Sequence, residues 1–292
     1  MERGGTLMEC NNNYIINKMF SVPYIDRMIQ KDYIPDSFKH CIKRYVKNES
    51  VSYGEAISEI YYYMDKNYRN EYFYKNTILN QLLLRKHDPY NTAALTELPI
   101  SGSKADFIMI NGKGIVYEIK TDLDNFSRLN HQINDYYKVF SYVYVVVSKD
   151  TVKNIQKVID NEMVGIYELT ENRNLIQRKK AYCNRKELSY DAMFQILRKQ
   201  EFEWILMKHF KKLPQVNSFQ YYRECLNWIK KINIISLQKD IMECLKKRTV
   251  LTIDNSLEDK VPYELRFYAY FSKCYNEDYS ELEKFLRRKV EG

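Results

Sequence analysis

The chain has 292 residues, of which 45% are hydrophobic and 29% charged, as expected for a globular protein with one large or two modest domains. Its net charge of +8 is compatible with a polyanionic partner. Apolar runs are far shorter than a membrane span and the first residues lack the features of a signal peptide, so we expect a cytoplasmic protein without membrane contact. No cysteine pair has zinc-ligand spacing.

Helical spacing of apolar residues dominates residues 21–86, where Ser50 and Ser52 are candidate helix N-caps. An extended segment then ends at Pro99, and "KADFIMI", "NGKG" and "IVYEIK" predict a hairpin, since Asn-Gly between apolar runs is a strong turn signal. A helix over 127–140, a buried strand over 142–148, a helix over 151–161 and a strand over 163–169 follow. This order predicts an α/β fold with a mixed sheet flanked by helices.

From about residue 187 onward every segment is predicted to be helical, and the charged run "QRKKAYCNRKE" indicates a boundary near residue 180. Residues 180–292 contain 22 Lys and Arg against 16 Asp and Glu, a balance of +6, whereas residues 1–179 have a balance of +2. We predict three parts: a helical N-terminal extension over 1–69, a core over 70–180, and an all-helical, basic C-terminal domain over 181–292. The last part is expected to hold substrate or a protein partner.

Glu118 and Lys120 end an otherwise apolar strand and share one of its faces, because they lie two residues apart. Asp106 lies on the preceding strand. A two-residue turn would direct Asp106 away from Glu118, whereas a three-residue loop over 112–114 pairs Asp106 with Lys120 and sets all three on one face. We therefore predict an odd-length loop or a bulge, which the two glycines of "NGKG" permit.

Two carboxylates and a lysine on one face suit phosphodiester hydrolysis. Asp106 and Glu118 offer hard oxygen ligands for Mg²⁺ or Mn²⁺, and such an ion lowers the pKa of a bound water and neutralises charge on a phosphate. Lys120 can orient that water, stabilise the transition state or act as the general base. Gln132 and Tyr136 lie one turn apart on the following helix, from which they can hydrogen-bond a phosphate or a metal-bound water.

Further candidates surround this set. Arg128 can clamp a phosphate oxygen, or it pairs with Asp124 one turn back. Glu71 on the preceding helix and Glu97 on the extended segment are the remaining candidate acids, and the residues alone do not decide between them.

The segment "ADFIMINGKGIVYEIK", followed by "QINDY", resembles the PD-(D/E)xK nuclease superfamily, with the Gln-x-x-x-Tyr motif typical of its RecB-like branch. The block "EIKTDLDNFSRLNHQINDYY", preceded by "KADF", is similar to one bacterial family of that superfamily, and the similarity covers roughly residues 70–170. The resemblance implies a restriction-endonuclease-like core over that range. The usual proline before the aspartate is absent, as is common in the superfamily.

Roles follow from the resemblance residue by residue. It implies that Asp106 and Glu118 are metal ligands, Lys120 is the catalytic lysine, and Gln132 and Tyr136 support the active site. An acidic residue of the first core helix often helps to bind metal in such folds, for which Glu71 is the candidate and Glu97 the rival. Lys104 stands where many relatives have Arg, and we expect Lys104 and Arg128 to contact nucleic acid.

We therefore expect a nuclease that depends on Mg²⁺ or Mn²⁺, hydrolyses phosphodiester bonds in DNA, and serves in phage defence or mobile-element biology. One alternative is a nucleic-acid-binding module that kept the fold but does not cut. The complete Asp/Glu/Lys set argues against it, because a pure binder gains nothing from carboxylates near phosphates. Another alternative is a module whose helical region docks a protein partner.

Overall fold

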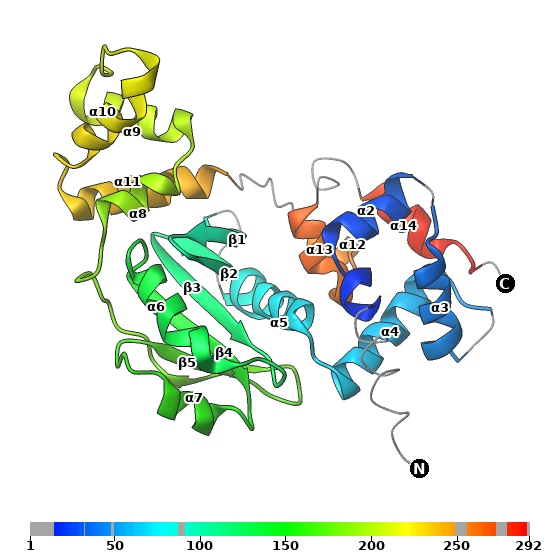
Figure 1. The fold of residues 1–292 in the computed structure, drawn as a ribbon. Helices are drawn as coiled ribbons and strands as arrows, with labels where there is room; N and C mark the ends of the chain where they lie inside the picture. Colours follow the sequence, from blue (N-terminus) through cyan, green and yellow to red (C-terminus); the bar gives the residue numbers. More distant parts are fainter. Residues whose placement is uncertain are drawn as a thin grey trace. The chain divides into compact units, whose positions relative to one another are not determined.

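The structure, a computed structural model, describes residues 15–31, 33–47, 50–86, 91–248, 256–272 and 279–290. The chain forms two compact units (Figure 1). The helical unit comprises Met1–Arg85 and Leu251–Gly292, and the sheet unit comprises Lys86–Val250. These units do not coincide with the three predicted parts, because the helices that follow the sheet belong to the sheet unit and only the last segment of the chain returns to the helical unit.

The helical unit is built from helices of both ends of the chain. Its N-terminal elements are α2 (Val22–Gln30), α3 (Asp36–Tyr45), α4 (Tyr53–Asn67), α5 (Glu71–Ile78) and the π-helix η1 (Leu79–Leu84). Its C-terminal elements are α12 (Ser256–Lys260), the 3₁₀-helix η3 (Tyr263–Leu265), α13 (Arg266–Phe271) and α14 (Ser280–Arg287). Ser52 is the N-cap of α4 and forms a capping box with Glu55, which confirms one of the two predicted caps.

A buried asparagine joins the two ends of the chain. Asn76 of α5 is fully buried, and its amide nitrogen donates to the Tyr61 hydroxyl (3.0 Å) and to the Tyr263 carbonyl (2.9 Å). Its side-chain oxygen accepts from the backbone N–H of Phe267 (2.9 Å). Two of these hydrogen bonds reach the C-terminal segment, so Asn76 ties that segment to α5.

The sheet unit has a six-stranded mixed sheet in the order β1-β2-β3-β4-β5-β6. The strands are β1 (Ala93–Ile100), β2 (Ser103–Asn111), β3 (Lys113–Lys120), β4 (Tyr142–Ser148), β5 (Gly165–Leu169) and β6 (Leu175–Lys179). β1, β2 and β3 are antiparallel neighbours, β3, β4 and β5 are parallel, and β6 is antiparallel to β5. The predicted mixed α/β architecture is therefore confirmed, with β6 as an additional edge strand.

Helices of the sheet unit follow the predicted order (Figure 1). They are the 3₁₀-helix η2 (Phe126–Arg128), α6 (Leu129–Tyr137), α7 (Val152–Val158), α8 (Tyr190–Gln195), α9 (Lys199–Phe210), α10 (Ser218–Ile229) and α11 (Ile234–Lys247). α11 packs on β1, β2 and β3. A Cβ on Gly114 would lie 2.5 Å from both Met242 Sδ and Phe140 Cδ1, so this glycine allows α11 to approach β3. The sheet and the helices α8 to α11 share one hydrophobic core. The boundary predicted near residue 180 therefore does not separate two domains.

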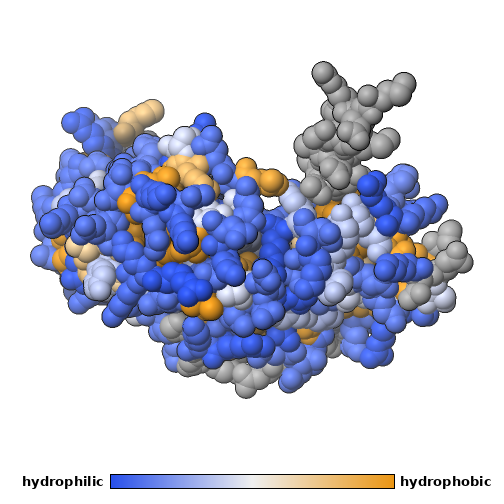
Figure 2. Space-filling model, turned by 90° about the horizontal axis from the view of Figure 1, so that it is seen from below, coloured by the Kyte–Doolittle hydropathy of each residue, from blue (hydrophilic) through white to orange (hydrophobic). Residues whose placement is uncertain are grey.

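Hydrophilic residues cover most of the face shown in Figure 2, and hydrophobic ones occur there as small patches. Within the described ranges, no helix combines the length and the apolar character that crossing a bilayer requires.

Candidate active site

The β2–β3 hairpin turns at Gly112, which has a φ of +67°. Asn111 pairs with Lys113 and Ile108 with Val116, so a single residue separates the paired strands. The predicted odd length is confirmed, but the predicted three-residue loop over 112–114 is wrong. The positive φ, which glycine adopts without strain, lets the chain reverse earlier than expected.

The register, continued by one position, sets Asp106 opposite Glu118 rather than opposite Lys120. Asp106 is half-buried, and its Oδ2 accepts a hydrogen bond of 2.8 Å from the backbone N–H of Ile119. The carboxylate therefore reaches β3 between Glu118 and Lys120. All three predicted residues meet at this end of the hairpin, as the parity of the loop requires.

Four of the predicted residues form one hydrogen-bond network. Lys120 Nζ donates to Glu118 Oε1 (2.9 Å) and to Gln132 Oε1 (3.0 Å). The Tyr136 hydroxyl lies 2.6 Å from Glu118 Oε2 and 2.9 Å from the Lys104 carbonyl oxygen, and its single proton serves one of them at a time. Both oxygens of Glu118 and the ammonium of Lys120 are thus held in place.

The helix α6 supplies two members of this network because its apolar side faces the sheet. Leu129, Ile133 and Tyr137 are buried in the core, and Gln132 and Tyr136 follow one another by one turn. Burial raises the pKa of Tyr136 far above its usual value, and the neighbouring Glu118 carboxylate raises it further. The tyrosine therefore remains protonated and acts as a donor.

The network places two charged side chains, Glu118 and Lys120, in the protein interior. Glu118 is 1% exposed and Lys120 8% exposed, and removing two charges from water costs more than their attraction returns unless further hydrogen bonds satisfy them. Here Tyr136 and Gln132 supply those hydrogen bonds. A hydrophobic pair would stabilise the sheet as well or better, so the arrangement points to chemistry rather than to stability.

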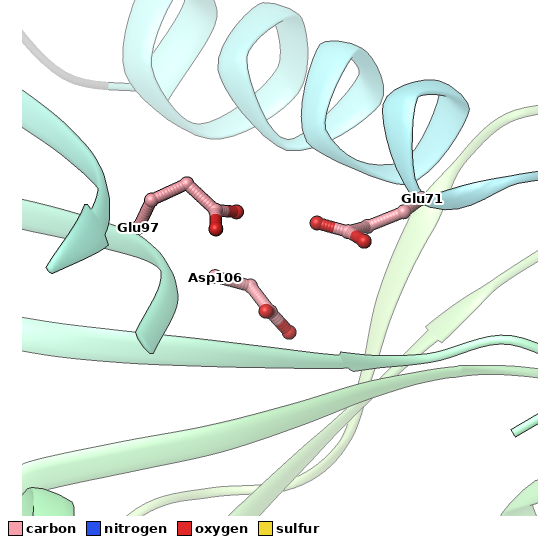
Figure 3. A group of neighbouring side chains, drawn as sticks. All are labelled: Glu71, Glu97 and Asp106. Carbon is pink, nitrogen blue, oxygen red and sulfur yellow. The ribbon is translucent and has the colours of Figure 1, made fainter. Parts of the chain in front are cut away.

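Glu97 lies beside Asp106 in a strained backbone position. Thr96 pairs with Phe107 and Leu98 with Ala105, which leaves Glu97 facing Asp106 across the β1–β2 ladder with a φ of +57°. A carboxylate oxygen of Glu97 lies within 4.8 Å of one of Asp106, and Figure 3 shows both side chains with the strands that carry them. Such a backbone conformation costs a non-glycine residue about 1–3 kcal/mol. Ser101, Arg173 and Lys211 also adopt it, at turns or a helix end, whereas Glu97 adopts it within a strand.

Glu71 belongs to the helical unit, where it opens the first turn of α5 (Figure 3). Its exposed carboxylate forms an ion pair with the buried Lys75 one turn along the helix. The role of Glu71 as a metal ligand stays a prediction from the resemblance.

The two cationic candidates are both exposed. Lys104 forms an ion pair with Glu97, and its side chain is 59% exposed. Arg128 ends η2. Asp124 accepts hydrogen bonds of 2.7 Å from both the backbone N–H and the hydroxyl of Thr121, and among the described residues no ion pair joins Asp124 to Arg128. The alternative reading of Arg128 as a partner of Asp124 is therefore wrong.

Asp135 has a positioning role that the sequence analysis did not assign to it. It is 1% exposed and accepts hydrogen bonds from the Ser103 hydroxyl and from Lys138 Nζ, each 2.7 Å long. Burial acts to raise its pKa, but the hydrogen bonds from Lys138 and Ser103 outweigh burial, and the pKa is lowered. Asp135 thereby fastens α6, and with it Tyr136, to the start of β2. An acid next to the motif tyrosine was the only signal for it in the sequence.

A family model described as bacteriophage P4 protein cII matches residues 64–260. The chain belongs to this family. The match to the P4 cII family spans the whole sheet and the helices α6 to α11, and so includes the network around Lys120. No curated protein and no solved structure matches the chain.

Proposed function

We propose that this P4 cII family protein is a divalent-metal-dependent nuclease of the PD-(D/E)xK type, with a restriction-endonuclease-like core, that hydrolyses phosphodiester bonds in DNA. The observation that carries the proposal is the buried network of Glu118, Lys120, Gln132 and Tyr136 at the end of β3, with Asp106 bonded to the same strand. Each of these residues had been predicted from the spacing of the motif.

The side chains at this end of the hairpin fit Mg²⁺ or Mn²⁺. Asp106 and Glu97 offer neighbouring carboxylate oxygens, the hard ligands that these ions prefer. Glu118 uses two hydrogen-bond positions out of about four that a carboxylate provides, so it retains capacity to bind a cation. When bound, such an ion acts as a Lewis acid that lowers the pKa of a water and neutralises charge on the phosphate.

The protein residues have separate tasks in the proposed hydrolysis. Lys120, held by Glu118 and Gln132, keeps its ammonium at the strand end, where it hydrogen-bonds the attacking water or a phosphate oxygen of the transition state. Tyr136 holds the second oxygen of Glu118 and so fixes the carboxylate in one orientation. Because these groups are positioned before substrate arrives, little reorganisation is needed during the reaction.

Exposed cations near the network are the proposed contacts for the nucleic-acid backbone. Lys104 lies on β2 two residues before Asp106, and Arg128 directly precedes α6, the helix that carries Gln132 and Tyr136. Helix α10 adds Phe219, which is 96% exposed, and exposed Arg223 one turn along, a combination suited to substrate or to a protein partner. The match to a phage protein family supports a role in phage or mobile-element biology, and a role in defence stays part of the proposal without support from that match.

A cleavage assay tests the proposal. Linear, circular and single-stranded DNA and RNA are incubated with Mg²⁺, Mn²⁺ or EDTA, for the wild type and for Lys120→Ala and Glu118→Gln. We expect DNA cleavage that EDTA abolishes and that each variant lowers by about 10²–10³-fold. Binding of DNA without cleavage in any metal would favour the non-cutting module instead, and cleavage that persists in both variants would refute the assigned residues.

A further inference from the structure

A hollow lies at the end of β3 opposite to Lys120. Its volume is about 350 Å³, and it is formed by the starts of β3 and β4 and by the segment that follows β6. β3 is about 23 Å long at roughly 3.3 Å per residue, so the hollow is separate from the candidate active site. Lys113 and Ile115 line it, and their side chains alternate with Val116 and Glu118, which face the other side of the sheet.

The lining of this hollow combines aromatic rings with positive charge. It contains Tyr142, Tyr144 and Tyr182 together with Lys113 and Lys180, and no acidic side chain. Lys113 Nζ lies 4.3 Å from the ring centroid of Tyr142, which places an ammonium directly over an aromatic face. Tyr182 is 55% exposed, so its ring is available for stacking.

Backbone contacts hold the walls of the hollow in place. The N–H of Tyr182 donates to the Met163 carbonyl (2.9 Å), and the N–H of Asn184 donates to the Ser141 carbonyl (3.0 Å). A Cβ on Gly165 would lie 2.3 Å from a ring carbon of Tyr144 and 2.6 Å from the Ala181 nitrogen, so only glycine admits this packing. A preformed wall binds a ligand at a small cost in ordering entropy.

We propose that this hollow binds a nucleoside phosphate, with the base against the exposed ring of Tyr182 and the phosphate on Lys113 and Lys180. The volume falls within the range of small-ligand sites, about 300–1,000 Å³. Aromatic faces accept any base, and two ammonium groups without a competing carboxylate favour an anion. The ligand is either a free nucleotide or one unit of a nucleic-acid strand, since both offer the same groups.

Isothermal titration tests the site in EDTA, so that the result is independent of the proposed nuclease activity. The probes are AMP, GMP, CMP, TMP, inorganic phosphate and a short single-stranded DNA. Lys113→Ala/Lys180→Ala removes the proposed phosphate contacts, and Lys153→Ala/Lys157→Ala on α7 removes the same charge from exposed positions elsewhere in the sheet unit. We expect at least tenfold weaker binding in the first double variant and no change in the second.

Two further outcomes assign the ligand. Tyr182→Ala should weaken binding of nucleotides and leave binding of inorganic phosphate unchanged, because the ring contacts only the base. Saturation by a mononucleotide alone identifies a free nucleotide, whereas saturation only by the strand identifies a nucleic-acid contact. The proposal is overturned if the wild type binds none of the probes at millimolar concentration, or if Lys113→Ala/Lys180→Ala binds them as the wild type does.

Discussion

Two adjacent tyrosines of α6 provide a matched test of the network. Tyr136 and Tyr137 are both 0% exposed, but only the Tyr136 hydroxyl has partners, whereas the Tyr137 hydroxyl is buried with no hydrogen-bond partner among the described residues. Tyr136→Phe removes a hydrogen bond to a charged acceptor, Glu118, and such bonds contribute about 1.5–3 kcal/mol. Tyr137→Phe removes a buried polar atom that gains nothing in the folded state, so it should be neutral or stabilising.

Chemical denaturation and thermal melting measure both variants. We expect Tyr136→Phe to lower the free energy of unfolding by about 2 kcal/mol, which corresponds to a fall in Tm of about 4–8 °C for a unit of this size. Tyr137→Phe should leave Tm unchanged or raise it. If Tyr136→Phe is as stable as Tyr137→Phe, the hydroxyl does not hold Glu118 and the derived network is incorrect.

Three further predictions follow from the same geometry. Lys120→Ala should destabilise by about 3–5 kcal/mol, because it leaves Glu118 buried without its partner, whereas Lys120→Met/Glu118→Gln should recover most of that stability in denaturation experiments but no cleavage. Asp135→Asn should cost stability at neutral pH. Because the folded pKa of Asp135 lies below the unfolded value near 3.9, the difference from wild type should shrink as pH falls below about 4, and a constant difference down to pH 2 would contradict this. Glu97→Gly should raise stability by about 1 kcal/mol, because glycine adopts the positive φ without strain, and it should weaken metal binding measured by calorimetry. Glu97→Gln keeps the strain, so it should weaken metal binding without the gain in stability.

The sequence predicted local elements and the grouping of the motif residues well, because both depend on short-range spacing. The strand predicted over 142–148 coincides with β4, since a short, continuous run of β-branched and aromatic residues favours a buried strand over a helix. The shared face of Asp106, Glu118 and Lys120 followed from the parity of the loop. The register itself did not, because whether one residue or three separate the strands depends on the backbone angle that Gly112 adopts.

Longer-range packing was harder to predict. β6 was missed because most of its side chains are exposed and polar, as at the edge of a sheet, so it lacks an apolar pattern. The grouping of the C-terminal helices also escaped prediction, since an amphipathic helix can bury its apolar side against any complementary surface. The features that decide the grouping are the space at Gly114 for α11 and the buried hydrogen bonds of Asn76 to the last segment.

The division of the helical unit between both ends of the chain has a consequence for synthesis on the ribosome. The sheet unit is one uninterrupted stretch, so all its strands and helices have emerged once residue 250 is made. The helical unit cannot complete its core until residues 251–292 have been made. Until then Asn76 lacks its hydrogen bonds to the backbone of Tyr263 and Phe267. A chain that ends after the sheet unit would therefore carry a complete sheet joined to helices that lack the contacts of the last segment, a product that proteases should remove.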